Sequence, residues 1–187
     1  MSVGTASCLC GSIKVEMRGD PYTSNLCHCS SCQKYTGSVF GWFAVYKAEV
    51  RPLSKPRPSL RLLHAYNYRD RSARKRTTFN TLTLGNQQQV TFTESEPSVM
   101  ITYKDASPES GETLARSFCG KCGSPVSSQT LSKPDMIVVP VGIVDGDKTA
   151  FKPQSEFYCK RRADWVPAIE GSKTFERMPP NPAPVTN

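Results

Sequence analysis

Apolar and polar residues alternate along several short stretches of the chain, which is the two-residue period of a half-buried β-strand. The pattern is clearest in residues 12–17 (SIKVEM). Residues 38–46 (SVFGWFAVY) form a continuous run of aromatic, small and β-branched side chains, which is typical of a buried strand. Further short strands are predicted at residues 90–93, 99–103, 114–119, 126–128 and 136–144.

Helical periodicity is scarce by comparison. The clearest apolar stripe with helical spacing is short and lies at residues 60–63. At 187 residues the chain has the length of one domain. We therefore predict a single, mainly β domain with short helices over residues 1–178, followed by a proline-rich tail at residues 179–187.

Two absences narrow the class of protein. No apolar run approaches the roughly 18 residues that a membrane span needs. The first residues, MSVGTASCLCG, lack the basic and apolar regions of a secretory signal. A protein of the cytoplasm that makes no contact with a membrane is expected.

The basic charge is concentrated in one segment. The chain has 24 basic and 16 acidic residues and a formal net charge of +8. Nine of the basic residues and a single acidic one, Asp70, lie within residues 51–76, so this segment alone accounts for the net charge. The remainder of the chain is neutral and gives no electrostatic reason to expect a nucleic-acid partner.

Residues 51–89 also differ in composition from their surroundings. The basic stretch is followed by Asn- and Gln-rich sequence with few apolar side chains and no clean alternation. We predict that residues 51–89 form a basic, disordered insertion that interrupts the domain. A retained intron is a further hypothesis for this segment, because joining Glu49-Val50 directly to Thr91-Phe92 would restore an uninterrupted segment of the surrounding domain.

Seven of the eight cysteines lie in three clusters with spacings typical of metal ligands. In a reducing compartment, closely spaced cysteines bind metal or do redox work more often than they form disulfides. C-x-x-C followed by glycine forms a tight turn that directs both sulfurs at one point, and the glycine allows a positive φ. The clusters are Cys8-Leu9-Cys10-Gly11, Cys27-His28-Cys29-Ser30-Ser31-Cys32 and Cys119-Gly120-Lys121-Cys122-Gly123.

Zinc suits these thiolates because it accepts tetrahedral geometry and has no redox chemistry. A structural zinc takes four protein ligands, whereas a reactive zinc keeps three and leaves its fourth position open. The only three-cysteine cluster is the candidate for the open site, and the other two clusters would together form the closed one; spacing alone leaves this division undetermined. The ligands would be Cys27, Cys29 and Cys32 in the open site and Cys8, Cys10, Cys119 and Cys122 in the closed site.

Together these motifs resemble the glutathione-dependent formaldehyde-activating enzyme family, whose domain centromere protein V shares. The resemblance rests on C-x-C-G, on C-H-C-x-x-C followed by Lys34 and Gly37, and on F-C-x-x-C-G-S at residues 118–124. Residues 156–166 and 175–179 resemble the C-terminal ends of fungal-type members.

The resemblance extends over residues 6–50 and 90–180 and implies an Mss4-like, mainly β fold with two zinc ions. It implies a structural zinc in the four-cysteine site and a catalytic zinc in the three-cysteine site. The reaction it implies joins glutathione and formaldehyde into S-hydroxymethylglutathione, a carbon–sulfur lyase reaction run in reverse. A small-molecule thiol, glutathione or a conjugate of it, is therefore the expected partner. Three thiolates make zinc a weak generator of hydroxide, which favours thiol binding over hydrolysis.

Other interpretations remain open at the level of the sequence. The shared domain of centromere protein V allows a non-catalytic zinc module that binds protein or nucleic acid, for which the basic residues 51–76 are the support. Fold analogy alone supports an exchange-factor-like binder or a chaperone. Cys29 and Cys32 have the spacing of a thioredoxin-like redox motif, but Cys27 precedes them and no βαβ pattern surrounds them.

Five further residues have a chemical interpretation beside an ordinary structural one. His28 either transfers protons or stabilises the turn between two ligand cysteines. Cys159 either supplies a fourth ligand or is a strand cysteine with no metal. Lys160, Arg161 and Arg162 either pair with the carboxylates of glutathione or form a solvated run of charge.

Overall fold

The computed structural model describes residues 3–47, 64–68, 77–81 and 89–179. This part of the chain consists mainly of β-strands, with one α-helix and three short 3₁₀ helices. The predicted mainly β class with short helices is therefore confirmed. None of the helices in the described residues is long and apolar enough to cross a membrane.

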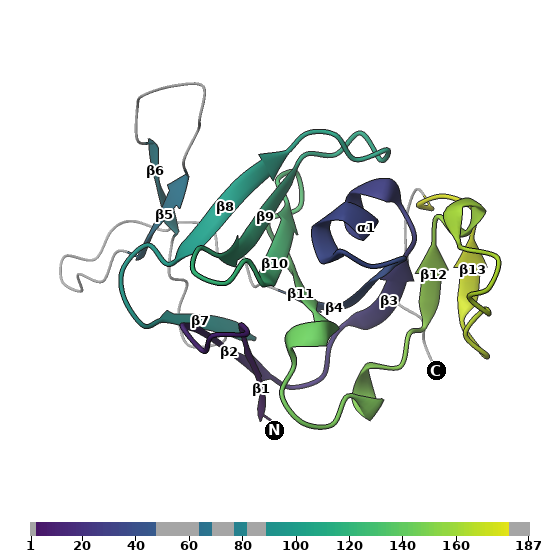
Figure 1. Cartoon of the computed structure of the whole chain (residues 1–187), viewed down its shortest axis with the longest axis horizontal. Coiled ribbons are helices and arrows are strands. Elements are labelled where there is room, and N and C mark those ends of the chain that lie inside the picture. The colour runs from purple at the N-terminus through teal and green to yellow at the C-terminus, as the bar shows by residue number, and fades with distance from the viewer. Residues whose placement is uncertain (1–2, 48–63, 69–76, 82–88, 180–187) are drawn as a thin grey trace.

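The strands form two sheets (Figure 1). The smaller sheet has the order β1-β2-β7, and its neighbours run antiparallel. Buried and exposed side chains alternate along the whole of β2, as its sequence predicts. The bounds are β1 (Val3–Ser7), β2 (Ile13–Arg18) and β7 (Val90–Glu94).

The larger sheet has the strand order β13-β12-β3-β4-β11-β10-β9-β8-β5-β6. Its neighbours run antiparallel, except that β12 is parallel to both β3 and β13 and β5 is parallel to β8. The bounds are β3 (Thr23–Cys27), β4 (Gly41–Lys47), β5 (His64–Tyr68), β6 (Thr77–Thr81), β8 (Met100–Asp105), β9 (Leu114–Cys119), β10 (Pro125–Thr130), β11 (Met136–Pro140), β12 (Ser155–Phe157) and β13 (Lys173–Phe175).

Strand β4 is covered on both faces, which explains its continuous apolar sequence. Ala44 and Tyr46 belong to the main core, which also contains Val15 of the smaller sheet. Phe43 belongs to a second core, together with Phe157 of β12. The main core is thus shared by the two sheets, while the second core lies around the only three-cysteine cluster.

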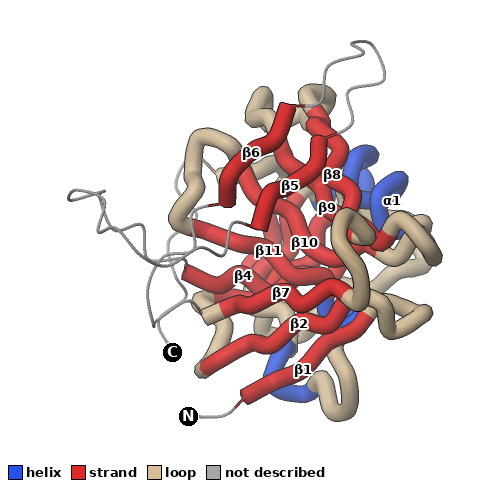
Figure 2. Tube along the Cα trace, turned by 90° about the vertical axis from the view of Figure 1, so that its left-hand side faces the viewer, coloured by secondary structure: helices blue, strands red, loops and turns tan. Residues whose placement is uncertain are grey.

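Helix α1 (Ser30–Thr36) contacts β4 and, in both views, lies on the part of the larger sheet away from the smaller one (Figures 1 and 2). It begins after Cys29, whose Sγ accepts a hydrogen bond from the backbone N–H of Cys32, and it ends at Gly37, where φ is +63°. Its seven residues are too short to display a helical period in the sequence. The 3₁₀ helices are η1 (Val141–Ile143), η2 (Thr149–Phe151) and η3 (Cys159–Arg161).

Most predicted strands are present, as β2, β4, β7, β8, β9 and β10. The predicted strand at residues 136–144 is too long, because β11 ends at Pro140 and η1 follows it. The short strands β1, β3, β5, β6, β12 and β13 were not predicted. The helical stripe at residues 60–63 lies outside the described residues.

Two stretches of the predicted insertion are described, and they form a hairpin of β5 and β6. This hairpin joins the larger sheet through a pairing of Tyr68 in β5 with Thr102 in β8. The remaining residues of the segment lie outside the described part of the chain, so its disorder and its status as an insertion stay predictions. Lys47, which precedes the segment, and Gln89, its last residue, are in contact, since the N–H of Lys47 donates to Gln89 Oε1 at 3.1 Å.

Candidate metal centre

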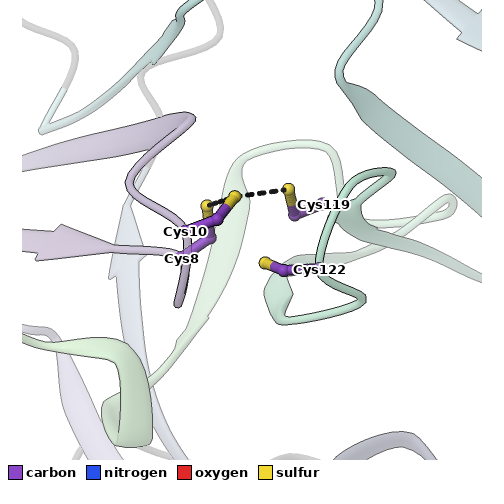
Figure 3. A group of neighbouring side chains, drawn as sticks. All are labelled: Cys8, Cys10, Cys119 and Cys122. Carbon is purple, nitrogen blue, oxygen red and sulfur yellow. Dashed lines mark hydrogen bonds between the residues drawn. The ribbon is translucent and has the colours of Figure 1, made fainter.

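Four cysteines from two distant parts of the chain meet at one point (Figure 3). The sulfur atoms of Cys8, Cys10, Cys119 and Cys122 lie within 4.8 Å of one another. Cys8 Sγ is 3.6 Å from Cys10 Sγ, and Cys10 Sγ is 3.7 Å from Cys119 Sγ. A tetrahedral zinc with Zn–S bonds of about 2.3 Å separates its sulfurs by about 3.8 Å. The spacing of these sulfurs therefore fits a zinc ion.

The turns that carry these cysteines have the conformation that their sequence predicts. Gly11 has a φ of +71° and Gly123 a φ of +74°, a region that residues with a side chain rarely adopt. Ser124 joins the two turns, because its Oγ accepts the N–H of Leu9 at 3.0 Å and lies 3.3 Å from Cys122 Sγ. The Ser124 hydroxyl is the main cause that lowers the pKa of Cys122 to about 5. A thiol with this pKa is a thiolate at neutral pH, the form that binds metal.

The four-cysteine group lies where the two sheets meet. Cys8 and Cys10 follow β1, a strand of the smaller sheet, whereas Cys119 ends β9 of the larger sheet. Cys8 and Cys119 are buried in the main core, and Cys10 is exposed. A metal ion bound here would link the smaller sheet to the larger one.

The other three clustered cysteines form a second, separate group. The sulfur atoms of Cys27, Cys29 and Cys32 lie within 4.8 Å of one another. They come from the end of β3 and the start of α1, and all three side chains are buried. Aromatic residues surround them, among them Phe43 and Tyr158. The group thus offers three soft ligands inside an apolar shell.

The pKa values of the thiols in this group indicate that a bound cation would stabilise it. Hydrogen bonds from the thiols of Cys27 and Cys32 lower the pKa of Cys29 to about 3. The same hydrogen bond to Cys29 raises the pKa of Cys27 far above that of an ordinary thiol. One thiolate is therefore stabilised by its neighbours, while a second and a third would repel it. A divalent cation removes this repulsion, so the donor set fits zinc.

Arg116 lies beside the three-cysteine group and was not anticipated from the sequence. Its guanidinium carbon is 4.8 Å from the ring centre of Tyr35, which packs on the group from α1. Arg116 Nε donates to Asp105 Oδ2 at 2.7 Å, and both side chains are buried. Its positive charge contributes to the lowered pKa of Cys29. The one available sequence signal was a basic residue in a strand three positions before Cys119.

His28 lies between two members of the group and is completely buried. Its Nε2 is 3.3 Å from Glu156 Oε2, and Glu156 is also completely buried. The other carboxylate oxygen accepts hydrogen bonds from the N–H of Ile169 and the hydroxyl of Ser172, each at 2.8 Å. Glu156 therefore joins the cysteine loop to the segment that precedes β13.

Cys159 takes a different position from the seven clustered cysteines. Its thiol donates to the backbone oxygen of Glu156 at 3.4 Å. The ligand atoms of His28, Glu156 and Cys159 lie within 4.8 Å of one another. Arg162 Nη1 is 3.5 Å from Glu156 Oε2, so a cation already faces this carboxylate. These contacts favour a structural role for His28, Glu156 and Cys159, as a hydrogen-bonded group, over a third metal site.

A cavity of about 340 Å³ adjoins the three-cysteine group. Cys29 is the member of the group that reaches it. Hydroxyl groups and a pair of opposite charges make up the rest of the wall. The lining residues are Cys29, Ser30, Ser31, Ser107, Glu109 and Arg161.

The three consecutive basic residues of η3 and its end have different partners. Lys160 Nζ and Arg161 both pair with Glu109, from the loop between β8 and β9. Arg162 instead faces the buried Glu156. Of these three residues, Lys160 and Arg161 are therefore the two that lie where they can meet a ligand in the cavity. The sequence could not distinguish them from Arg162.

The fold and the two cysteine groups define a mainly β protein with two separate thiolate sites suited to zinc, one of them beside a cavity. The chain matches the model of the family described as glutathione-dependent formaldehyde-activating enzyme over residues 3–71 and 69–161. These matches cover most of the sequence. The chain belongs to this family.

One solved structure with a similar chain is the crystal structure of a Rhodobacter sphaeroides protein determined in a structural genomics project. The two chains are 16% identical, and the TM-score is 0.44. The similarity covers 78% of this chain and 91% of the Rhodobacter sphaeroides chain. Comparison with curated proteins gave no match.

Proposed function

We propose that the protein is a zinc-dependent enzyme that joins glutathione, or a related small thiol, to formaldehyde and forms S-hydroxymethylglutathione. In the opposite direction this reaction breaks a carbon–sulfur bond, so the enzyme is a carbon–sulfur lyase. The observation that carries the proposal is the position of Cys29, which belongs to the three-cysteine group and also lines the cavity. Membership of the formaldehyde-activating family supports it.

The two cysteine groups have different roles in this proposal. Three thiolates leave one position of a tetrahedral zinc open to a substrate, whereas four close the coordination sphere. The position of the four-cysteine group between the sheets agrees with a structural role. Cys27, Cys29 and Cys32 hold the catalytic zinc, and Cys8, Cys10, Cys119 and Cys122 hold the structural zinc.

Zinc bound by the three-cysteine group would supply a position that stabilises a substrate thiol as its thiolate. The chain holds the two reactants together in a cavity of about 340 Å³. Ser30 and Ser31 contribute hydroxyl groups to its wall, which can donate hydrogen bonds to the oxygen of formaldehyde. The new carbon–sulfur bond forms as the carbonyl bond opens to an alkoxide. The alkoxide takes up one proton, which balances the proton that the thiol released.

The charge near the cavity suits glutathione. Glutathione carries two carboxylates, and Arg161 lines the cavity with Lys160 beside it on η3. Arginine binds carboxylates through two parallel hydrogen bonds. A carboxylate of the bound thiol therefore pairs with these two cations in the proposed complex.

Location, subfamily and domain organisation complete the proposal. All eight cysteines are free, which suits the reducing cytoplasm. Residues 156–166 and 175–179 support a place among the fungal-type members of the family. We take residues 1–178 as one domain that a basic insertion interrupts at residues 51–89.

The test is an NMR exchange measurement of glutathione with formaldehyde, from which the uncatalysed rate is subtracted. The wild-type protein should accelerate the exchange, and Cys27→Ser should abolish the acceleration. Cys159→Ser is the matched control, because it removes a thiol outside the three-cysteine group, and it should keep the wild-type rate. No acceleration by the zinc-loaded wild-type protein, or equal acceleration by Cys27→Ser, would refute the proposal.

A further inference from the structure

Three cations surround one carboxylate at the wall of the cavity. Lys160 Nζ pairs with Glu109 Oε1, and Arg161 places Nε at 3.2 Å and Nη2 at 3.0 Å from Glu109 Oε2. Arg177 Nη1 lies 3.7 Å from Glu109 Oε1. Lys160 and then Arg161 lower the pKa of Glu109, so this side chain is ionised at neutral pH. We call these four residues the Glu109 cluster.

The Glu109 cluster belongs to the same cavity as the three-cysteine group. Glu109 and Arg161 line the cavity together with Cys29. Glu109 comes from the loop between β8 and β9, whereas Arg161 lies 52 residues later, in η3. An ion pair between two separate segments thus forms part of the wall that faces the cysteine.

The charge of the Glu109 cluster is unbalanced. Its three cations face a single carboxylate. The cluster therefore keeps a net positive charge, which attracts anions to the cavity.

Arg161 can bind a carboxylate of a ligand through the same two nitrogen atoms that now bind Glu109. Two nitrogen atoms of its guanidinium contact one oxygen of Glu109, and the side chain remains 45% exposed. Exposed ion pairs of this kind are weak, about 0.2–1 kcal/mol each, so a ligand can exchange with them. Glu109 occupies the nitrogen donors that a carboxylate of a small molecule would use.

We propose that Glu109 is a built-in competitor of the substrate, and that a thiol carrying a carboxylate displaces it from Lys160 and Arg161 when it binds. Glu109 then lowers the affinity for carboxylate-bearing thiols while leaving neutral thiols unaffected. The inference rests on the proposed function, because it takes the cavity as the site of the thiol substrate. It adds the residue that determines selectivity and the charge of the thiols that the cavity prefers.

Glu109 could also have the opposite effect on glutathione binding, and the experiment below distinguishes the two. Glu109 would instead attract a ligand if it paired with an ammonium group, such as the one that glutathione carries. In that case removal of its charge would weaken the binding of glutathione. Competition predicts the reverse sign.

The test measures dissociation constants by titration calorimetry on the zinc-loaded protein without formaldehyde. The ligands are glutathione, its dimethyl ester, which lacks free carboxylates, and the neutral thiol 2-mercaptoethanol. Glu109→Gln should bind glutathione about three to ten times more tightly than the wild type, the effect of removing one or two exposed ion pairs. It should bind 2-mercaptoethanol with the wild-type constant.

Glu112→Gln is the matched control, because Glu112 lies in the same loop, outside the cavity wall, and contacts Ser132. Its constants should equal those of the wild type. In the wild type itself, the dimethyl ester should bind more weakly than glutathione, a result that needs no variant. Weaker or unchanged binding of glutathione by Glu109→Gln, or an equal change for both thiols, would overturn the inference alone. Binding of none of the three thiols to the wild type would overturn the proposed function as well.

Discussion

His28 Nε2 lies 3.3 Å from Glu156 Oε2, and neither side chain has any exposed surface. Their segments are 128 residues apart in sequence, and this contact fixes the loop that carries Cys27 and Cys29 against β12. The backbone N–H of His28 reinforces it by donating to Phe157 O at 2.9 Å. The position of the three-cysteine group thus depends on the buried carboxylate of Glu156, which lies outside the group.

Replacement of Glu156 should therefore be among the most damaging substitutions in the chain. Glu156→Ala leaves His28, Arg162 and the N–H of Ile169 without their acceptor inside the protein. Each buried donor that loses its acceptor costs about 1–3 kcal/mol. Urea unfolding should show this loss of free energy. The exposed-loop variant Glu112→Ala should lose less than about 0.5 kcal/mol, and a similar loss in both variants would contradict the role of Glu156.

The buried pair of Asp105 and Arg116 should make the stability depend on pH. Burial raises the pKa of Asp105, but the hydroxyl of Ser107 and the guanidinium of Arg116 outweigh it and lower the pKa below that of an ordinary aspartate. A lowered pKa in the folded state gives stability that is complete above the unfolded pKa of about 3.9 and is lost as the pH falls below it.

The measurement is the free energy of unfolding of the wild type and of Asp105→Asn between pH 3 and pH 7. The difference between them should be largest near neutral pH and should shrink below about pH 4. A difference that stays constant over the whole range would contradict the assignment.

The four-cysteine group should contribute more to stability than the three-cysteine group. A metal ion at the former links the smaller sheet to the larger one, and metal binding free energy is folding free energy. Cys10 is exposed, so Cys10→Ser removes a ligand without disturbing the core. We expect its melting temperature to fall by several times more than that of Cys32→Ser. Equal melting temperatures for the two variants would argue against the structural assignment.

Deletion of the basic segment distinguishes the proposed enzyme from the alternative function, a zinc module that binds protein or nucleic acid. Because Lys47 and Gln89 are in contact, a short Gly-Ser linker can replace residues 51–88; this removes the β5–β6 hairpin from the edge of the larger sheet and leaves the other strands in place. This variant should keep its zinc and the exchange of glutathione with formaldehyde, because the segment contributes no residue to the described cavity wall. A polyanion-binding protein would lose salt-sensitive binding to nucleic acid on the same deletion. It would not accelerate the exchange of glutathione with formaldehyde either before or after the deletion.

Much of the fold could be predicted because its strands have simple patterns. Residues 12–17 alternate because β2 has one buried and one exposed face, and residues 38–46 do not alternate because β4 is covered on both faces. The strand β12 and helix α1 escaped prediction because three and seven residues are too few to show a period. The end of β11 escaped because Val141 and Ile143 are as apolar as the strand before them.

The cysteines of the candidate site could be found because metal ligands keep fixed local spacings. The residues around them could not, since Arg116, Glu109 and Glu156 come from strands and a loop that are far from the cysteines of this site in sequence. The sequence likewise gave Lys160 and Arg162 the same appearance, although one pairs at the surface and the other faces a buried carboxylate. Such differences arise from tertiary packing, which no local spacing records.

The most direct test of the account is the zinc content of the purified protein. The wild type should contain about two zinc ions per chain, and Cys32→Ser about one, with the fold retained by circular dichroism. Loss of the acceleration of glutathione and formaldehyde exchange should accompany the loss of the single ion. One zinc ion or none in the wild type, or two in a Cys32→Ser protein that still turns over, would contradict the assignment of a reactive zinc to Cys27, Cys29 and Cys32.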